Sequence, residues 1–252
     1  MKKTAAIGGH RWIYENLIEQ LRNTDFATSA KHLDLALNDA GEAEIPFLGV
    51  TYLISNEGVR RSDGKGFKET IGSVLIHYIL KGSSSRPAGN FITFAELAGP
   101  LFKQSSYSSS ALERPIIKRF QGHVPELFEA AALYGGHEGG EAGLGSVSLI
   151  FELLPHIVLQ IIFYDRDDEF PARATLLFDL NVTQLIDFEV LAVLVTEFIQ
   201  TLINPIIDAT QDDWTIVLQC NRSQGPYFHK APKGEDRPHN QVMTAGLRSG
   251  RR

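Results

Sequence analysis

Three runs of mostly apolar residues decide the fold: SVSLIFELL (146–154), HIVLQIIFY (156–164) and ARATLLFD (172–179). Each run has the length of a typical strand, and β-branched, leucine and aromatic residues dominate it. Pro155 separates the first two runs, and because proline cannot donate to a sheet ladder this break predicts a tight turn. The first two runs are apolar on both faces, as in a sheet that is covered on both sides. The stretch therefore predicts an antiparallel hairpin followed by a third strand.

A long helix is predicted directly after these strands, at 187–203. Its apolar residues recur every three or four positions and form a wide stripe: Leu191, Leu194, Val195, Phe198 and Leu202, widened by Phe188, Val190, Ile199 and Ile203. A stripe this wide indicates burial on more than one side or a subunit interface, and burial in the core is the simpler interpretation. Asp187, Glu189 and Glu197 argue against a membrane span.

The rest of the chain predicts an α+β fold in which a mixed or antiparallel sheet is flanked by helices. Apolar periodicity predicts helices at 11–22, 25–37, 65–80, 112–120 and 125–134, and strands at 45–54 and 59–61. A short strand and helix are expected across 91–97, and the glycine-rich 135–145 is expected to be a loop. We expect one domain, 1–220, followed by a flexible, disordered basic C-terminal tail, 221–252.

Composition and charge limit the class of protein. With 43% hydrophobic and 21% charged residues, the chain has the composition of a globular protein with a sizeable core. The net charge is −6, although the tail carries seven basic and two acidic residues, so the body is the acidic part. An acidic body argues against nucleic acid as the main partner. The single cysteine, Cys220, can form neither an internal disulfide nor a cysteine-based metal cage, and it fits a cytoplasmic protein.

The acidic turn DRDDEFP (165–171) is the first candidate site. Asp165, Asp167, Asp168 and Glu169 place four carboxylates within five residues. Such loops can hold Ca²⁺ or Mg²⁺, and paired carboxylates can serve as acid and base where burial separates their pKa values. The spacing does not match an EF-hand loop. A solvated hairpin turn, in which aspartates hydrogen-bond the local backbone, is the alternative.

Asp179 and His77 are the other candidates for chemistry. Asp179 ends an apolar strand just before a helix, a place where ligands often bind in layered folds, and the same position also suits helix capping. His77 lies at the edge of the apolar face of the helix 65–80, where an imidazole can act in acid–base chemistry, bind a metal or be structural. An enzyme would use His77, Glu169 and Asp179 together.

Short motifs in a fixed order resemble an uncharacterised family, domain of unknown function 3786. They are Ile45-Pro46-Phe47-Leu48-Gly49, Leu75-Ile76-His77-Tyr78-Ile79-Leu80, Phe91-Ile92-Thr93-Phe94-Ala95-Glu96-Leu97, Phe120, Phe128, Gly135-Gly136, Asp168-Glu169-Phe170-Pro171 and Leu176-Leu177-Phe178-Asp179. The resemblance spans about 45–203. It implies anaerobic bacteria or archaea as the source and no established reaction. It also implies association with a four-cysteine iron–sulfur domain of the kind found in corrinoid proteins. With one cysteine, this chain would obtain any cluster from a partner.

Three function hypotheses remain open from the sequence. The first is a non-catalytic accessory or ligand-binding protein of anaerobic metabolism that serves an iron–sulfur or corrinoid partner. The second is the enzyme with His77, Glu169 and Asp179 as acid–base or metal groups. The third is a protein-interaction module that uses the long helix or the basic tail as its contact surface.

Overall fold

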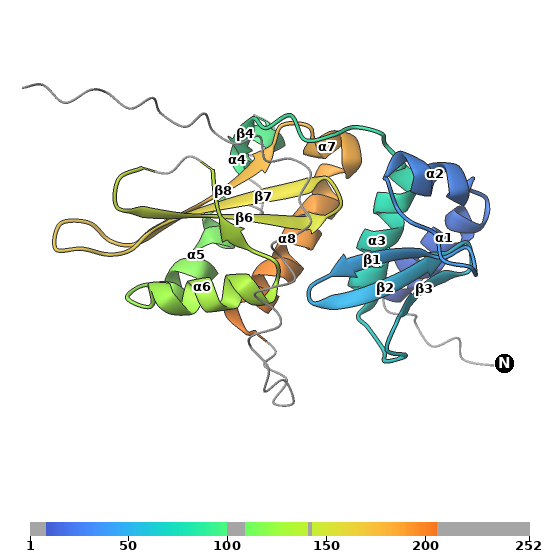
Figure 1. Cartoon of the computed structure of the whole chain (residues 1–252), viewed down its shortest axis with the longest axis horizontal. Coiled ribbons are helices and arrows are strands. Elements are labelled where there is room, and N and C mark those ends of the chain that lie inside the picture. The colour runs from blue at the N-terminus through green and yellow to red at the C-terminus, as the bar shows by residue number, and fades with distance from the viewer. Residues whose placement is uncertain (1–8, 100–108, 141–142, 206–252) are drawn as a thin grey trace, which may run out of the picture. The chain divides into compact units, whose positions relative to one another are not determined.

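The computed structural model describes residues 9–99, 109–140 and 143–205, which belong to the first of the chain's two units, Met1–Asp208. These residues form eight helices and eight strands, and the strands make two antiparallel sheets (Figure 1). The predicted α+β class, with helices flanking antiparallel sheets, is confirmed. The predicted tail 221–252 and Cys220 lie outside the described residues.

The larger sheet has five strands in the order β4-β8-β7-β6-β5. Its centre is formed by β6 (Ser146–Leu154), β7 (Ile157–Tyr164) and β8 (Arg173–Asp179), which pair as consecutive antiparallel neighbours. The short strands β4 (Phe91–Thr93) and β5 (His137–Glu138) flank them. The hairpin and third strand predicted around Pro155 are confirmed, whereas β5 was missed within the predicted glycine-rich loop.

One face of this sheet is fully buried and the other only partly. Along β7, Ile157, Leu159, Ile161 and Phe163 are buried, while Val158, Ile162 and Tyr164 between them are half-buried. Gln160 and Ser148 on the second face are nevertheless buried, so the predicted cover is complete on one face and partial on the other. Apolar side chains are common at the protein surface, so an apolar run alone does not establish burial on both faces.

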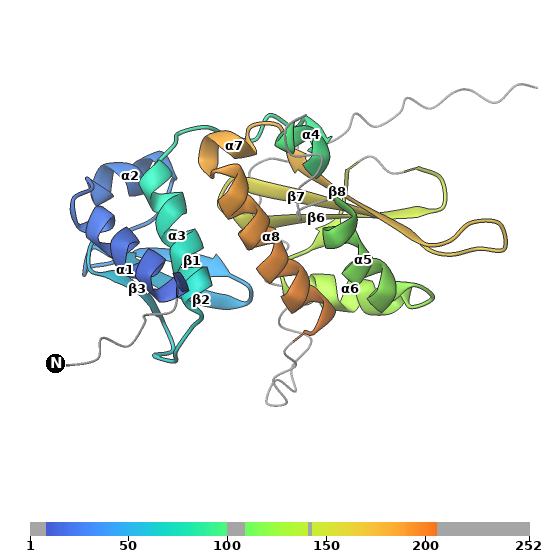
Figure 2. The same ribbon diagram turned by 180° about the vertical axis from the view of Figure 1, so that it is seen from behind.

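Helix α8 (Phe188–Ile203) lies against the buried face, and α5 (Ser109–Phe120) packs against α8 and β8 (Figure 2). Phe198 of α8 packs on Phe151 of β6 with ring centroids 4.9 Å apart. The prediction of a long buried helix at 187–203 is confirmed, with Asp187 at the N-cap. The shorter helices of this half are α4 (Phe94–Ala98), α6 (Val124–Leu133) and α7 (Val182–Leu185).

The N-terminal half builds the smaller sheet, β1 (Ala43–Phe47), β2 (Val50–Ser55) and β3 (Gly58–Arg61), beside the helices α1 (Gly9–Arg22), α2 (Phe26–His32) and α3 (Glu69–Lys81). The single strand predicted at 45–54 was wrong: it is the hairpin β1–β2. Leu48 and Gly49 turn the chain with φ of 54° and 74°, as a two-residue hairpin loop requires. Glycine supplies this conformation readily, but leucine seldom adopts it.

The two halves share one hydrophobic core because α3 packs against α8. The predicted helix 25–37 ends early, as α2 stops at His32 and the chain turns at Asp34 with φ of 56°. Helix α3 ends at Gly82, whose left-handed backbone (φ 50°) lets its N–H bond the carbonyl of Tyr78. The loop that follows reaches the end of β8. No described helix has both the length and the apolar character needed to cross a membrane.

Substituting Gly72→Ala should destabilise the fold, because α1 and the loop before α3 approach this glycine closely. An added Cβ would lie 2.5 Å from Tyr14 Cε2 and 2.7 Å from Phe67 Cε2. Overpacking costs about 1–3 kcal/mol, and the better helix propensity of alanine offsets about 1 kcal/mol of this cost. We expect a net loss of up to about 2 kcal/mol in the free energy of unfolding, measured in urea.

The matched control is Gly66→Ala, since a Cβ at Gly66 would meet nothing within 4 Å. This variant should unfold like the parent protein. A Gly72→Ala protein as stable as Gly66→Ala would contradict the close packing of α1 on α3.

Candidate functional site

The three residues predicted for an enzyme occupy separate places. Glu169 lies in the turn before β8, and Asp179 is the last residue of β8. Seven strand residues at about 3.3 Å each put the two carboxylates at opposite ends, about 20 Å apart. His77 lies on α3. The structure therefore does not bring Glu169 and Asp179 into one cleft, and their catalytic roles stay predictions.

The carboxylate of Asp179 is buried and used by the backbone. Its oxygens accept hydrogen bonds from the N–H groups of Ala88 (3.0 Å), Gly89 (2.7 Å) and Asn181 (2.9 Å), and the residue is 1% exposed. Of the two sequence interpretations, ligand contact and turn structure, the geometry favours the second. Asp179 ties the loop that follows α3 to the end of β8.

The acidic turn has the geometry of a braced hairpin. Asp165 Oδ1 accepts a hydrogen bond from the Gly122 N–H at 2.7 Å, and Asp167 Oδ1 accepts bonds from the N–H groups of Glu169 and Phe170. Asp168 and Glu169 are exposed. In residues 9–99, 109–140 and 143–205, no three His, Cys, Asp or Glu side chains are grouped so that they could hold a metal ion.

His77 is half-buried on α3 and faces the start of α8. Burial lowers the pKa of its imidazole, and the carboxylate of Asp187 acts in the opposite direction. Asp187 is also held by Lys81, whose Nζ lies 2.5 Å from Oδ1. These contacts link α3 to the start of α8.

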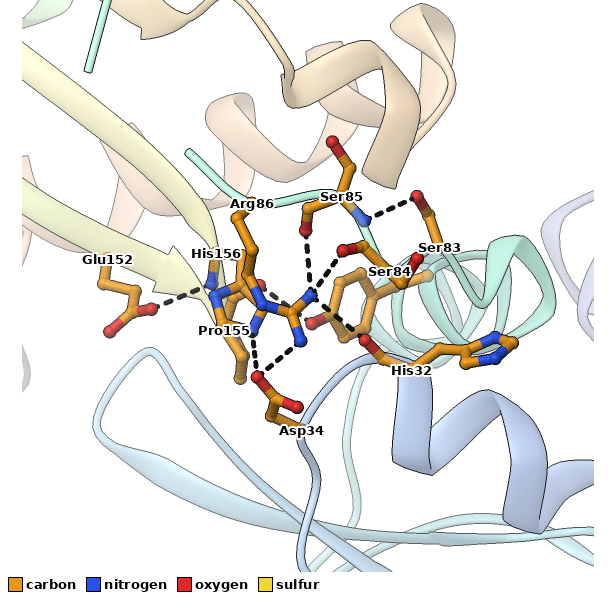
Figure 3. A network of polar contacts seen from close by, with 10 residues as sticks. His32, Asp34, Ser83, Ser84, Ser85, Arg86, Glu152, Pro155 and His156 are labelled. Atoms are coloured by element: carbon orange, nitrogen blue, oxygen red, sulfur yellow. Dashed lines mark hydrogen bonds and ion pairs between the residues drawn. The ribbon is translucent and has the colours of Figure 1, made fainter. Parts of the chain in front are cut away.

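A different cluster, absent from the sequence predictions, forms where α2, the loop after α3 and the β6–β7 turn meet (Figure 3). We call Asp34, Tyr78, Arg86, Glu152 and His156 the clasp. His156 sits in the turn with φ of 65°, and its N–H donates to Glu152 Oε1 at 2.8 Å. The buried Tyr78 hydroxyl donates to the carbonyl of Pro155 at 2.8 Å. The turn is thereby fixed from two sides.

Asp34 and Arg86 cover the His156 ring. Arg86 Nη2 donates to Asp34 Oδ2 at 2.5 Å, and His156 Nε2 lies 3.3 Å from the same oxygen. Arg86 Nη1 contacts three backbone carbonyls, those of His32 (3.1 Å), Ser84 (2.9 Å) and Ser85 (3.0 Å). The guanidinium is therefore held in one orientation, as Figure 3 shows.

The His156 imidazole is 7% exposed, yet neither ring nitrogen makes a hydrogen bond with any described residue. The 3.3 Å approach to Asp34 is short enough for an ion pair, but it lacks the geometry of a hydrogen bond. A buried polar group without a partner costs about 1–3 kcal/mol. Burial lowers the pKa of His156, Arg86 lowers it further, and Glu152 and Asp34 act in the opposite direction. The imidazole is therefore neutral near pH 7.

Backbone strain also concentrates in the clasp. Among the described residues, three non-glycine positions have positive φ, and Asp34 and His156 are two of them. Such conformations persist where surrounding structure enforces them, and they gather at functional sites. The clasp residues come from separate parts of the sequence and form no motif. The spacing of residues along the sequence therefore could not predict that they meet. The only local signal was a histidine placed directly after the proline of a predicted turn.

Substituting Asp179→Asn should destabilise the protein. The amide NH₂ would face backbone N–H groups that need an acceptor, so at least one buried donor would lose its partner. We expect a loss of about 1–3 kcal/mol in the free energy of unfolding. Glu169→Gln, at an exposed position, is the control and should change stability by less than about 0.5 kcal/mol. Equal effects of the two substitutions would contradict the structural role of Asp179.

Acidification should destabilise the protein through His156 and His77. Both have folded-state pKa values below the ordinary value of about 6.5, so the unfolded chain binds more protons. Stability should be level above about pH 6.5 and fall as the pH drops from there toward the folded-state pKa values. Each group adds at most about 1.4 kcal/mol per pH unit.

His156→Asn should flatten this slope, because asparagine tolerates positive φ but does not titrate. Urea unfolding at several pH values measures the slope. A slope that His156→Asn does not alter would contradict the assignment.

The family model for a domain of unknown function (DUF3786) matches residues 25–201. This range begins earlier than the resemblance in the sequence suggested, and it contains all five residues of the clasp. No curated protein and no solved structure shows a significant match to the chain. Since the family model covers more than half of the chain, the protein belongs to the DUF3786 family.

Proposed function

We propose that this protein binds a small oxyanion, foremost a carboxylate, and that Asp34 occupies the place of this ligand in the structure. One observation carries the proposal: Arg86 and His156 converge on a single carboxylate oxygen, Asp34 Oδ2. Guanidinium groups bind carboxylates through charge-assisted hydrogen bonds. A neutral imidazole supplies one further N–H.

Some residues of the clasp are held more firmly than others. Three carbonyls fix the Arg86 guanidinium, and Glu152 and Tyr78 hold the backbone of the turn that carries the buried His156 ring. The Asp34 carboxylate is 58% exposed, and its polar side-chain contacts within the described part of the chain are with Arg86 and His156. The two donors are thus preorganised, whereas the acceptor is a surface side chain that can rotate away.

Exchange of one carboxylate for another preserves the charge balance of the clasp. Removing Asp34 without replacement would leave the partly buried Arg86 unpaired, which is unfavourable. A ligand carboxylate restores the same contact. It also gives the His156 ring the hydrogen-bond partner that it lacks.

Acid–base catalysis by the Asp34–His156 pair is the second candidate. A carboxylate beside a buried imidazole of lowered pKa suits a general base that is unprotonated at neutral pH. This pair replaces the set His77, Glu169 and Asp179 as the better-placed acid–base group. Substitution of His156 distinguishes the two functions. Oxyanion binding tolerates a non-titrating donor such as asparagine at this position, whereas proton transfer does not.

An accessory role beside an iron–sulfur or corrinoid protein of anaerobic metabolism, in the cytoplasm, completes the proposal. Family resemblance supports it, together with the single cysteine, which implies that any cluster belongs to a partner. Binding of an oxyanion at the clasp would then signal the presence of this ligand to that partner.

Asp34→Ala should expose the oxyanion position and make the protein responsive to formate. The variant should lose about 1–2 kcal/mol of stability, because the exposed ion pair contributes up to about 1 kcal/mol and alanine is disfavoured at the positive φ of residue 34. Sodium formate should raise the stability of the variant, by about 2.7 kcal/mol at one hundred times its dissociation constant. Urea unfolding in sodium formate, compared with sodium chloride at equal ionic strength, measures the effect.

The matched control is the double variant Asp34→Ala with Arg86→Gln, which lacks the cation and should not respond to formate beyond chloride. Parent protein should respond less than Asp34→Ala, since its own carboxylate competes. A formate response of equal size in the single and double variants would refute the proposed oxyanion site.

A further inference from the structure

An open hollow of about 480 Å³ lies where α5 crosses β8, away from the clasp. Its lining residues come from three elements: Glu113 and Ile117 of α5, Tyr164 at the end of β7, and Arg173, Ala174 and Thr175 of β8. Small-molecule sites have volumes of this order. The hollow brings a carboxyl, a guanidinium, a hydroxyl and an aromatic ring together beside two apolar side chains.

Glu113 provides a half-buried carboxyl with no cationic partner. Burial raises its pKa, and a backbone hydrogen bond from Leu176 acts in the opposite direction. Within the described part of the chain, Glu113 forms no ion pair. A cation bound beside this partly buried carboxylate would stabilise its charged form.

Arg173 provides the opposite charge in the lining, and this residue is exposed. Its guanidinium carbon lies 5.0 Å from the centroid of the Tyr164 ring, the residue that it pairs with across β7 and β8. Such stacking orients the guanidinium without neutralising it. Arg173, like Glu113, has no ion-pair partner among the described residues. Thr175 follows two residues along β8 and so points to the same face.

We propose that this hollow binds a small zwitterion of the α-amino acid class, with its ammonium group at Glu113 and its carboxylate at Arg173. The two side chains line one hollow but form no ion pair with each other. A ligand that carries both charges can contact both side chains, whereas a singly charged ligand can pair with only one of them. This site goes beyond the oxyanion function of the clasp and shares no residue with it.

The apolar part of the lining restricts the ligand further. Ile117 and Ala174 offer an aliphatic wall beside the charged groups. A short branched side chain would bury apolar surface there, at about 25 cal/mol per Å². The structure thus favours a small aliphatic amino acid over one with a polar side chain.

Calorimetric titration with L-valine tests this site, using isovalerate and isobutylamine as analogues that lack the amine and the carboxylate. L-Valine should bind, and each analogue should bind about tenfold more weakly or worse. Isovalerate or isobutylamine binding as tightly as L-valine would overturn the proposal, as would no heat of L-valine binding at about 10 mM.

Glu113→Gln and Arg173→Gln should each weaken L-valine binding by about tenfold or more. Glutamine at 113 keeps an acceptor for the Leu176 N–H, and urea unfolding confirms that each variant is folded. Lys118→Gln, which alters another exposed cation of α5, is the control and should bind L-valine like the parent. Unchanged binding in both Glu113→Gln and Arg173→Gln would overturn the proposal.

Asp34→Ala separates this site from the clasp. It should bind L-valine as the parent does, whatever its response to formate. Loss of L-valine binding in Asp34→Ala would place the amino acid at the clasp and so overturn the assignment to the hollow.

Discussion

Burial of α8 on two sides is the constraint on which the rest of the structure depends. Seven of its side chains are buried, and they contact the five-stranded sheet on one side and α3 on the other. A helix with so wide an apolar stripe cannot be stable on one sheet face alone. Helix α3 covers the remainder, and polar contacts fix their register at both ends, with Lys68 bound to Glu197 and Lys81 to Asp187.

The position of α3 in turn places the clasp. Tyr78 lies on the buried side of α3, and its hydroxyl reaches the carbonyl before His156. The β6–β7 pairing is irregular between Glu152 and Leu154, just before the turn. Such an irregularity bends a strand and redirects its side chains. Here it allows the Glu152 carboxylate to accept the His156 N–H. The strained turn therefore depends on core packing beneath it and on a bulge beside it.

Local patterns predicted the core well because they act over a few residues. The strands around Pro155 and the helix at 187–203 show their periodicity directly, and both are confirmed. The β1–β2 hairpin was missed because Leu48 takes a left-handed backbone conformation. Leucine seldom adopts this conformation, so its presence in the sequence does not indicate a turn. The end of α2 was missed because the apolar spacing continues through Leu33 and Leu37, past the point where the backbone turns.

The clasp could not be predicted because its contacts join distant residues. Asp34 meets Arg86 and His156 only after the sheet registers, the end of α2 and the α3–α8 packing are set. Sequence reasoning instead favoured carboxylates that cluster locally. The acidic turn gathers its aspartates by adjacency, and there they bond the nearby backbone. Asp179 stood apart from the others in the sequence, and three backbone N–H groups bond its buried carboxylate.

An internal carboxylate at the clasp has a consequence for any ligand that uses the same place. Arg86 is only partly exposed, and without Asp34 it would be a poorly solvated cation beside a neutral imidazole. Asp34 therefore lets the chain fold before any ligand arrives. The same contact lowers the apparent affinity of the ligand, in proportion to the fraction of molecules whose Asp34 has swung away. The proposed oxyanion site, occupied by the chain's own carboxylate, would thus combine stable folding with weak, concentration-dependent binding, which would suit a response to abundant small carboxylates and not to traces.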